Sequence, residues 1–438
     1  MCKGKIKVIA AIAALLLALP AGAQDESYNT YSPYSVFGVG DLFHRGTSSS
    51  KSMGGVGIAN RDKRFVNLMN PASVTERDDK SFMADFGLSA GNRLYAKGDK
   101  RSANNTFNIY DFAFSFPVFK NFAMYAGITP FSGIGYQVSS KVTDPSIIGH
   151  TGNITVTADG YGDMTGIFLG AGYKFTKGLS AGVEVEYIFG NLHKNNAQVF
   201  STSSYSSIYS GYNMHMHAFA PKVGVQYEFP LASEVTATVG ATYRLKAGLH
   251  GSLRDFEYNV VGSVTDTTRI VTTKLGGDGD RVSLGDEIGV GFSVKGRDRW
   301  FAELDYQRSD WTSCGMDHAG FANVGKAVFS ATASQGVRAG FSFVPNRNDI
   351  RYYYRRITYR GGAYWDQAYY KLDGNTINSF GLTFGVTLPV YYMNNGLSLG
   401  VDIGQRGSMQ GNKVRERYVN FHIGLNMFEI WFLKPRYN

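Results

Sequence analysis

The feature that most limits how this chain can fold is a two-residue alternation of apolar and polar side chains, which recurs from Ser81 almost to the C-terminus. Successive side chains of a β-strand point to opposite faces of a sheet, so this period predicts strands with one apolar and one polar face. About fourteen stretches of this kind predict an all-β protein. In one of them, Val235, Ala237, Val239 and Ala241 alternate with Thr236, Thr238, Gly240 and Thr242.

The connections between the predicted strands alternate in length. Short turns, such as Lys120-Asn121, alternate with long connections, which cover 138–160, 193–218, 250–281 and 311–335. Bacterial outer-membrane barrels have an even number of antiparallel strands, short periplasmic turns and long extracellular loops. We therefore predict a transmembrane antiparallel β-barrel of about fourteen strands over residues 80–438, with the short turns in the periplasm. One strand is expected over 351–359, after a turn at 345–349.

Residues 1–23 have the pattern of a secretory signal peptide. Three lysines precede an apolar run over 8–19, which is too short to span a bilayer, and Ala21-Gly22-Ala23 resembles a cleavage site. We expect export, and then a location in the outer membrane of a Gram-negative bacterium with outer-membrane lipid as a partner. Cleavage would leave one cysteine, Cys314, which excludes a disulfide framework.

Residues 24–79 show neither a helical nor a strand period. They are rich in serine and glycine, including Gly54, Gly55 and Gly57, and they end on Asn70-Pro71-Ala72. We expect an irregular plug, or hatch, in the lumen of the barrel. An irregular buried backbone needs hydrogen-bond partners, and the Asn70 amide offers a donor and an acceptor, so it is expected to hold the plug to backbone near the periplasmic end.

These features together resemble the long-chain fatty-acid transporter (FadL-like) family of outer-membrane proteins. The run over 53–59 and the tripeptide Asn70-Pro71-Ala72 stand where that family has its hatch. The stretches 31–35, 355–362 and 431–437 look like those of one divergent branch of the family. The resemblance implies passive transport of hydrophobic, fatty-acid-like small molecules, which leave sideways through a kink in the third strand. Candidate kink residues in this chain are Pro130, Ser132, Gly133 and Gly135.

Two functions stay open at this point. The first is a carrier that binds and passively transports a hydrophobic small-molecule ligand. The second is a FadL-like structural subunit or docking platform, with protein partners in an envelope complex for secretion or outer-membrane assembly. The residues of a ligand pocket cannot be assigned from the sequence.

Enzymatic, cofactor, metal and nucleic-acid functions are not predicted. Gly55-Val56-Gly57 lacks the strand and helix of a dinucleotide site, and His215 and His217 lack an evident third metal ligand. The positive charges form no cluster of the kind that binds nucleic acid. The carboxylates predicted to face the lumen are expected to pair with arginines and lysines; they are Glu184, Glu186, Glu303 and Asp305.

Overall fold

The computed structural model describes residues 29–78, 80–202, 204–262, 264–277, 279–318, 320–322, 328–390, 396–410 and 413–430. The predicted signal peptide at 1–23 and the stretch 431–437 lie outside these residues. Within the described ranges, no helix has the length and apolar character needed to cross a membrane.

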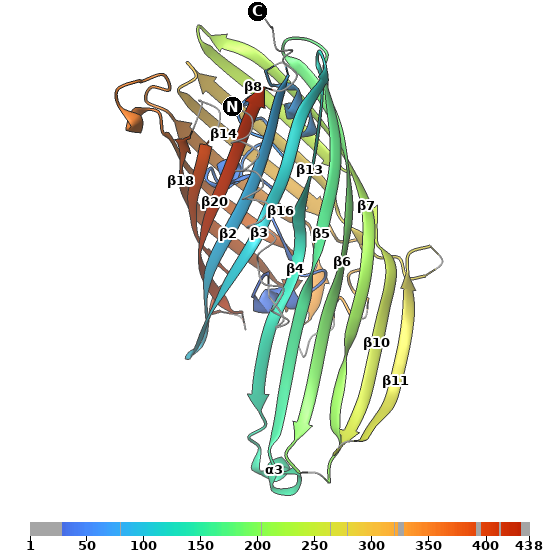
Figure 1. Ribbon diagram of the computed structural model, residues 1–438. Helices are drawn as coiled ribbons and strands as arrows, with labels where there is room; N and C mark the ends of the chain where they lie inside the picture. The colour runs from blue at the N-terminus through green and yellow to red at the C-terminus, as the bar shows by residue number, and fades with distance from the viewer. Residues whose placement is uncertain are drawn as a thin grey trace, which may run out of the picture.

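Fourteen strands form one closed antiparallel barrel (Figure 1), which confirms the predicted fold class. The ring closes where β20 pairs with β2, from Ser81 opposite Ile430 to Ala96 opposite Arg415. In order around the barrel, the strands are β2 (Ser81–Lys97), β3 (Lys100–Phe119), β4 (Phe122–Lys141), β5 (Ile154–Lys174), β6 (Leu179–Phe200), β7 (Ser207–Ala232), β8 (Val235–Arg244), β13 (Asp286–Gly296), β14 (Trp300–Asp310), β16 (Ser334–Phe343), β17 (Thr358–Leu372), β18 (Asn375–Pro389), β19 (Gly396–Arg406) and β20 (Arg415–Ile430).

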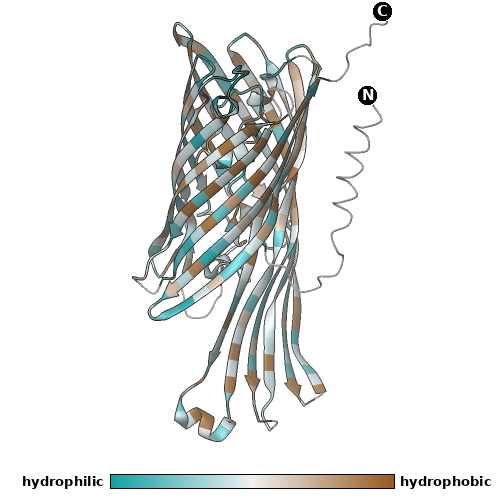
Figure 2. Cartoon of the chain, turned by 60° about the vertical axis from the view of Figure 1, so that its left-hand side comes forward, coloured by the Kyte–Doolittle hydropathy of each residue, from teal (hydrophilic) through white to brown (hydrophobic). Residues whose placement is uncertain are grey.

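The two faces of the strands differ as the alternation predicts. On β8, the outward side chain of Val239 is 48% exposed and the inward side chain of Thr238 is 4% exposed. Exposed apolar side chains recur around the wall, and Figure 2 shows them as brown bands on its outer surface. Such an apolar outer band suits contact with lipid, while the polar residues face the lumen.

The N-terminal segment, which is residues 29–78, lies inside the barrel (Figure 1). It is mostly irregular, with four short elements: η1 (Pro33–Val36), β1 (Asp41–Leu42), α2 (Ser48–Lys51) and η2 (Pro71–Thr75). Inward-facing glycines of the wall make room for its backbone. A Cβ atom added at Gly240 would collide with the carbonyl oxygen of Ile58, and one at Gly362 would collide with the amide of Gly54. The high glycine content therefore lets the wall and the segment approach closely.

One side of the barrel extends into a sheet that we call the wing. It consists of 136–141, 154–162, 191–200 and 207–216 in β4–β7, together with β10 (His250–Val261) and β11 (Val264–Leu275). β7 changes partners along its length, because β10 pairs with its first part and β8 with its last. The outer face of β6 is apolar from Val183 to Phe189 and turns polar at Asn191 and His193. The wing therefore projects beyond the apolar band.

The wing corrects the prediction that 193–218 and 250–281 are long loops. Most of these residues continue β6 and β7 or form the β10–β11 hairpin. Their backbone groups find hydrogen-bond partners in neighbouring strands. Because these residues lie beyond the apolar band, their side chains need not face lipid and are mostly polar. The connection at 138–160 is likewise mostly strand, with the short helix α3 (Pro145–Thr151) at its tip.

The strand predicted over 351–359 is also wrong. The 3-10 helix η3 (Tyr353–Arg355) lies there, and β17 begins only at Thr358. Asp349 explains the difference, because its carboxylate accepts hydrogen bonds from the backbone N–H groups of Arg351 and Tyr352, at 2.9 and 2.7 Å. These bonds fold the chain into a turn where the alternation of side chains indicates a strand.

Candidate functional site

Wall carboxylates hold the N-terminal segment from one side of the lumen. Asp305 accepts hydrogen bonds from the backbone N–H groups of Gly57 and Ile58, at 2.8 and 3.0 Å, and Glu303 accepts one from Ala59 at 2.7 Å. These two carboxylates were predicted to pair with arginine or lysine. Instead they satisfy amides of an irregular buried backbone, which has no strand or helix partners of its own.

Glu184 follows the prediction for lumen carboxylates. Its two oxygens accept hydrogen bonds from Arg45 at 2.5 and 3.1 Å, and the guanidinium of Arg45 also lies 3.9 Å from the centre of the Phe168 ring. The ion pair joins the N-terminal segment to β6. Two strands of the wall, β6 and β14, are therefore linked to the segment by charge-assisted contacts.

Asn70 is fully buried and joins the segment to β7 and β8. Its Nδ2 lies 2.8, 3.2 and 3.4 Å from the carbonyl oxygens of Ile58, Val225 and Ala241. Its Oδ1 accepts a hydrogen bond from the backbone N–H of Ala72 at 3.0 Å, which caps the 3-10 helix η2. Pro71 occupies the first position of that helix, where it is well accommodated.

The glycines predicted for the hatch lie against other strands than Asn70. Gly54 and Gly55 have φ angles of +71° and +83°, which favour glycine. The N–H of Gly54 donates to Thr383 Oγ1 at 2.7 Å, and its carbonyl oxygen accepts from Arg338 Nη1 at 3.1 Å. Gly57 donates to Asp305, as described above.

The barrel wall is open between β3 and β4. These strands pair only between Phe112–Ile128 and Phe119–Phe122, after which they diverge (Figure 1). We call the unpaired edges, 101–111 of β3 and 129–137 of β4, the seam. The predicted kink residues lie on the β4 edge, where Pro130 and Ser132 flank a register shift against β5. Proline has no N–H to donate, which suits an edge of this kind.

The beginning of the N-terminal segment occupies the free edge of β4. β1 pairs with this strand, Asp41 opposite Gly133 and Leu42 opposite Ser132. Ser32 N–H donates to the carbonyl oxygen of Gly135 at 2.7 Å. Asn29 also contacts the other side of the seam, where its carbonyl oxygen accepts a hydrogen bond from Asn108 of β3. Residues 29–43 thus take the position that β3 leaves vacant.

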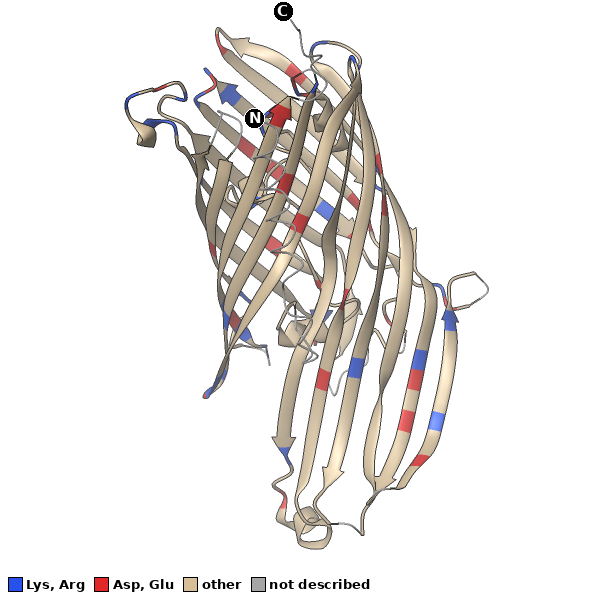
Figure 3. Ribbon diagram, in the orientation of Figure 1, with Lys and Arg blue, Asp and Glu red and all other residues tan. Residues whose placement is uncertain are grey.

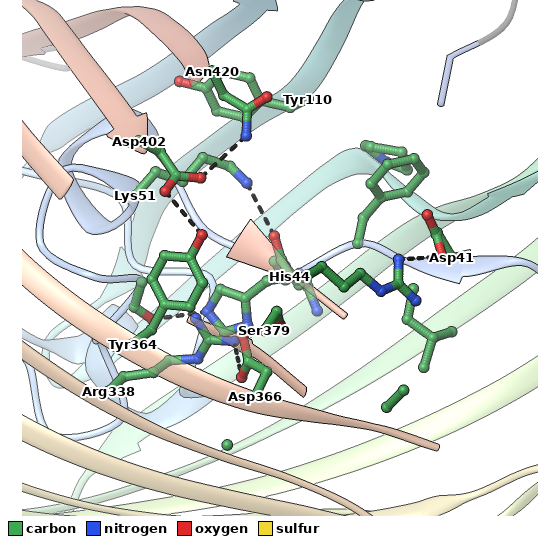
Figure 4. Close-up of a pocket in the computed structure, with 18 of the residues that line it drawn as sticks. Asp41, His44, Lys51, Tyr110, Arg338, Tyr364, Asp366, Ser379, Asp402 and Asn420 are labelled. Carbon is green, nitrogen blue, oxygen red and sulfur yellow. Dashed lines mark hydrogen bonds and ion pairs between the residues drawn. The ribbon is translucent and has the colours of Figure 1, made fainter. Parts of the chain in front are cut away.

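A cavity of about 430 Å³ lies beside the seam and is lined by both charged and apolar groups (Figure 4). Residues of the seam line one side of it, including Asn108, Ile109, Thr129 and Pro130. Six cationic and four acidic side chains also line it: Arg45, Lys51, Arg93, Arg308, Arg338 and Arg406, with Asp41, Glu287, Asp366 and Asp402.

Most of the charged side chains around the cavity are already bonded to another side chain. Arg338 donates to Asp366 at 2.7 Å, and Arg406 donates to Asp41 at the same distance. Asp402 accepts from Tyr364 at 2.8 Å and from Asn420 at 3.1 Å, as Figure 4 shows.

Lys51 differs from these groups. Within the described ranges its Nζ forms no ion pair; it donates one hydrogen bond to the carbonyl oxygen of His44 at 3.0 Å and lies 5.0 Å from the centre of the Tyr110 ring. Burial lowers the pKa of Lys51, and the carboxylates of Asp111 and Asp402 act in the opposite direction. Burial, aided by Arg338, also lowers the pKa of His44 well below its usual value. Lys51 is therefore a cation available to an anionic group in the cavity.

The structure puts the predicted site residues in three places. The hatch glycines Gly54, Gly55 and Gly57 lie against β14, β16 and β18. Pro130, Ser132, Gly133 and Gly135 lie at the seam, and Asn70-Pro71-Ala72 lies against β7 and β8. Gly54, Gly55 and Pro130 also line the cavity, but its charged residues were not identified from the sequence. Inward parity on the strands could have indicated Arg338, Asp366 and Asp402, but an irregular segment gives no period that would place Lys51 or His44.

The closed barrel, its apolar outer band and its filled lumen define an outer-membrane β-barrel with a FadL-like fold. The sequence profile of the BamG family matches residues 5–438, and the chain belongs to that family. The chain thus has the FadL-like fold and belongs to a divergent branch, as we predicted from the sequence.

Solved structures with the same fold support this assignment. A FadL homologue of Pseudomonas aeruginosa shares 11% identity at a TM-score of 0.58, over 89% of this chain and 99% of that one. The toluene transporter TodX of P. putida shares 12% identity at a TM-score of 0.56, over 91% of this chain and 100% of that one. The toluene transporter TbuX of Ralstonia pickettii shares 16% identity at a TM-score of 0.55, over 87% of this chain and 98% of that one. No curated protein matches the sequence. At these identities the likeness establishes the fold.

Proposed function

We propose that this protein binds amphipathic, fatty-acid-like molecules and carries them passively across the outer membrane. The observation that supports this most directly is the continuity between a cation-rich cavity and the seam in the wall. Hydrophobic cargo is also in line with the fold, since two of the similar structures are toluene transporters. A cavity that has charged groups and ends at the lipid-facing wall suits a ligand with one charged end and one apolar end.

In this proposal Lys51 binds the anionic head of the ligand. The side chain is in place without a carboxylate partner, and Asn420 and Tyr364 stand nearby with hydrogen-bonding groups (Figure 4). The apolar tail points toward Ile109 and Pro130 at the seam, where burying apolar surface is favourable. No covalent chemistry is required.

The N-terminal segment acts as the hatch. Residues 29–43 are held to the β4 edge mainly by backbone hydrogen bonds, and their release would open the seam between β3 and β4 to the lipid. The ligand then leaves sideways through the kink at Pro130, Ser132, Gly133 and Gly135.

Binding of the head group can be tested with a matched pair of ligands. We expect purified protein to bind a long-chain fatty acid more tightly than the fatty alcohol of equal length, and Lys51→Gln to remove about tenfold of that preference, as for a charge-assisted hydrogen bond. Lys120→Gln, on an exposed turn, is the control and should keep the preference. If the acid and the alcohol bind equally to the parent protein, Lys51 is not a head-group site.

Release of the hatch can be tested with a reversible crosslink. Leu42→Cys and Ser132→Cys place two thiols on paired residues of β1 and β4, in a Cys314→Ser background. Oxidation should stop uptake of the ligand, and reduction should restore it. A crosslink between paired β2 and β20 residues, Ala96→Cys and Arg415→Cys, is the control. Uptake that continues through the oxidised β1–β4 crosslink would contradict the lateral route.

A second candidate function is favoured by the wing, namely a structural subunit of an envelope complex. β11 pairs with β10 on one side, and among the described residues no strand pairs with its other side. Residues 264–272 of this strand are all exposed. An open strand edge offers backbone groups to another chain. The family name also hints at an envelope complex.

Native mass spectrometry of gently extracted protein separates the two candidates. A protein partner at near-stoichiometric yield would support the role of a structural subunit if it is lost when β11 carries a proline at an exposed position, as in Ile270→Pro. A bound amphipathic molecule without protein partners would support the carrier.

A further inference from the structure

The connection between β16 and β17 is the longest at the end of the barrel that carries the short turns. It covers 344–357, whereas two residues connect β3 to β4 and β7 to β8 at the same end. Figure 1 shows this connection, in orange, projecting sideways from the wall rather than over the lumen. We call it the flange.

The flange combines positive charge with exposed aromatic surface. It contains four arginines, Arg347, Arg351, Arg355 and Arg356, and one acidic residue, Asp349. Its positive positions are visible in Figure 3. Tyr352, Tyr353 and Tyr354 are 37%, 45% and 54% exposed, and Ile350 at the tip is 98% exposed.

Internal contacts hold the flange in one shape. Besides its two backbone hydrogen bonds, Asp349 pairs with Arg355 at 3.2 Å, and the backbone N–H of Tyr352 lowers the pKa of Asp349. The Tyr353 hydroxyl donates to the carbonyl oxygen of Pro389 at 3.0 Å, which ties the flange to the end of β18. Arginine guanidinium groups lie 4.9 Å from the ring of Tyr352 and 5.0 Å from that of Tyr353. Because one carboxylate stands against four arginines, the flange keeps a net positive charge.

We propose that the flange binds the anionic head group of a phospholipid in the adjacent leaflet. Tyrosine rings settle at the head-group level of a bilayer, and arginine recognises phosphate through paired N–H groups. The flange stands outside the wall, where the neighbours of a barrel are lipids, and the bare side chain of Ile350 can enter the edge of the acyl region. By the rule that short turns are periplasmic, this leaflet is the inner leaflet of the outer membrane. The site is independent of the cavity and of the proposed transport.

The test compares lipid preference in purified full-length protein. Native mass spectrometry would measure retention of phosphatidylglycerol against phosphatidylcholine. We expect the parent to prefer phosphatidylglycerol, and the triple variant Arg351→Gln, Arg355→Gln, Arg356→Gln to lose about tenfold or more of that preference. The control removes three charges from other turns at the same end, through Lys120→Gln, Lys177→Gln and Arg297→Gln, and should keep the preference.

A second measurement leaves the arginines intact. Ile350→Cys, labelled with an environment-sensitive dye in a Cys314→Ser background, should show a blue shift in nanodiscs of phosphatidylglycerol that is smaller in phosphatidylcholine. Equal retention by the two triple variants, or no dye response to the anionic lipid, would overturn the proposal. The proposal would also be overturned if the flange variant lost an acidic protein partner and kept its lipid preference. The flange would then be a protein-docking site.

Discussion

Asn70→Ala tests whether the N-terminal segment is latched to the wall. The amide has two hydrogens, so the carbonyl oxygens of Ile58, Val225 and Ala241 share two hydrogen bonds, and Oδ1 accepts a third from Ala72. Gln226 also donates to Ile58 at 2.9 Å, so that carbonyl keeps a partner in the variant. At about 1 kcal/mol for each bond, the bonds to Ile58 and Ala72 within the segment account for about 2 kcal/mol and the bond to the wall for about 1 kcal/mol.

The barrel itself should stay folded, because the strand pairings do not depend on this side chain. A loss of about 1 kcal/mol of wall contact corresponds to about a fivefold rise in the population of a detached segment. We expect faster hydrogen exchange over 53–75, with unchanged heat-modifiable mobility of the barrel, and greater leak of small antibiotics into cells.

Asn67→Ala is the matched control. This half-buried asparagine donates to the carbonyl oxygens of Gly57 and Asn60, at 2.7 and 3.1 Å, so its bonds stay within the segment and do not reach the wall. It should speed local exchange without raising leak. If Asn70→Ala matches the parent in both exchange and leak, or if both variants leak equally, the wall contacts of Asn70 are not a latch.

Three further predictions concern the faces, the orientation and the carboxylates of the wall. Val239→Arg places a cation toward lipid and should cost about 2–4 kcal/mol near the midplane, whereas Thr236→Arg, at the open rim of the lumen, should cost much less; equal loss of folded, heat-modifiable protein would mean that the faces are misassigned. Single cysteines at Tyr205 and Asn121, in a Cys314→Ser background, should be labelled in whole cells at 205 and protected at 121, and the reverse result would invert the topology. Asp305→Ala leaves the amides of Gly57 and Ile58 without their acceptor and should destabilise this loop by about 2–4 kcal/mol, measured by hydrogen exchange, while Asp305→Asn keeps an oxygen and should cost less; equal effects would exclude the hydrogen bonds as the cause.

The barrel was predictable because lipid imposes a simple rule on sequence. Each strand must be apolar on one face where it meets the membrane, and Val239 beside Thr238 follows that rule. The wing was missed for the same reason. Outside the lipid, strands such as β10 and β11 are held by backbone pairing and a few side-chain contacts, such as that of Asp255 with Arg269. The threonine-rich sequence of β11 has no alternation of apolar and polar residues that separates it from a loop.

The contents of the lumen were less predictable. The segment is irregular, so the partners of its backbone amides depend on distant wall residues, as with Asp305 and Gly57. Asn70-Pro71-Ala72 indicated where the segment ends, and its amide could be expected to find carbonyl groups. Lys51 gave no such signal, because its position depends on how α2 sits between β18, β19 and β20.

The contacts of the N-terminal segment suggest which part of it moves. Residues 45–75 are fixed by the ion pair of Arg45, by Asp305 and by Asn70, which reach β6, β14, β7 and β8. Releasing that part would leave buried charges and amides without partners, which is costly. Residues 29–43 pair with the free edge of β4 and also bind β17 and β19, through Tyr369, Tyr370 and Arg406. The side chains of Tyr34, Val36, Phe37 and Val39 are buried in the core. Within the proposed function, the part that must move is the stretch on the β4 edge, because Asp41 and Leu42 pair with the seam directly. Residues 45–75 bind strands away from the seam and can stay in the lumen, so the barrel need not admit water through its centre when a ligand leaves through its wall.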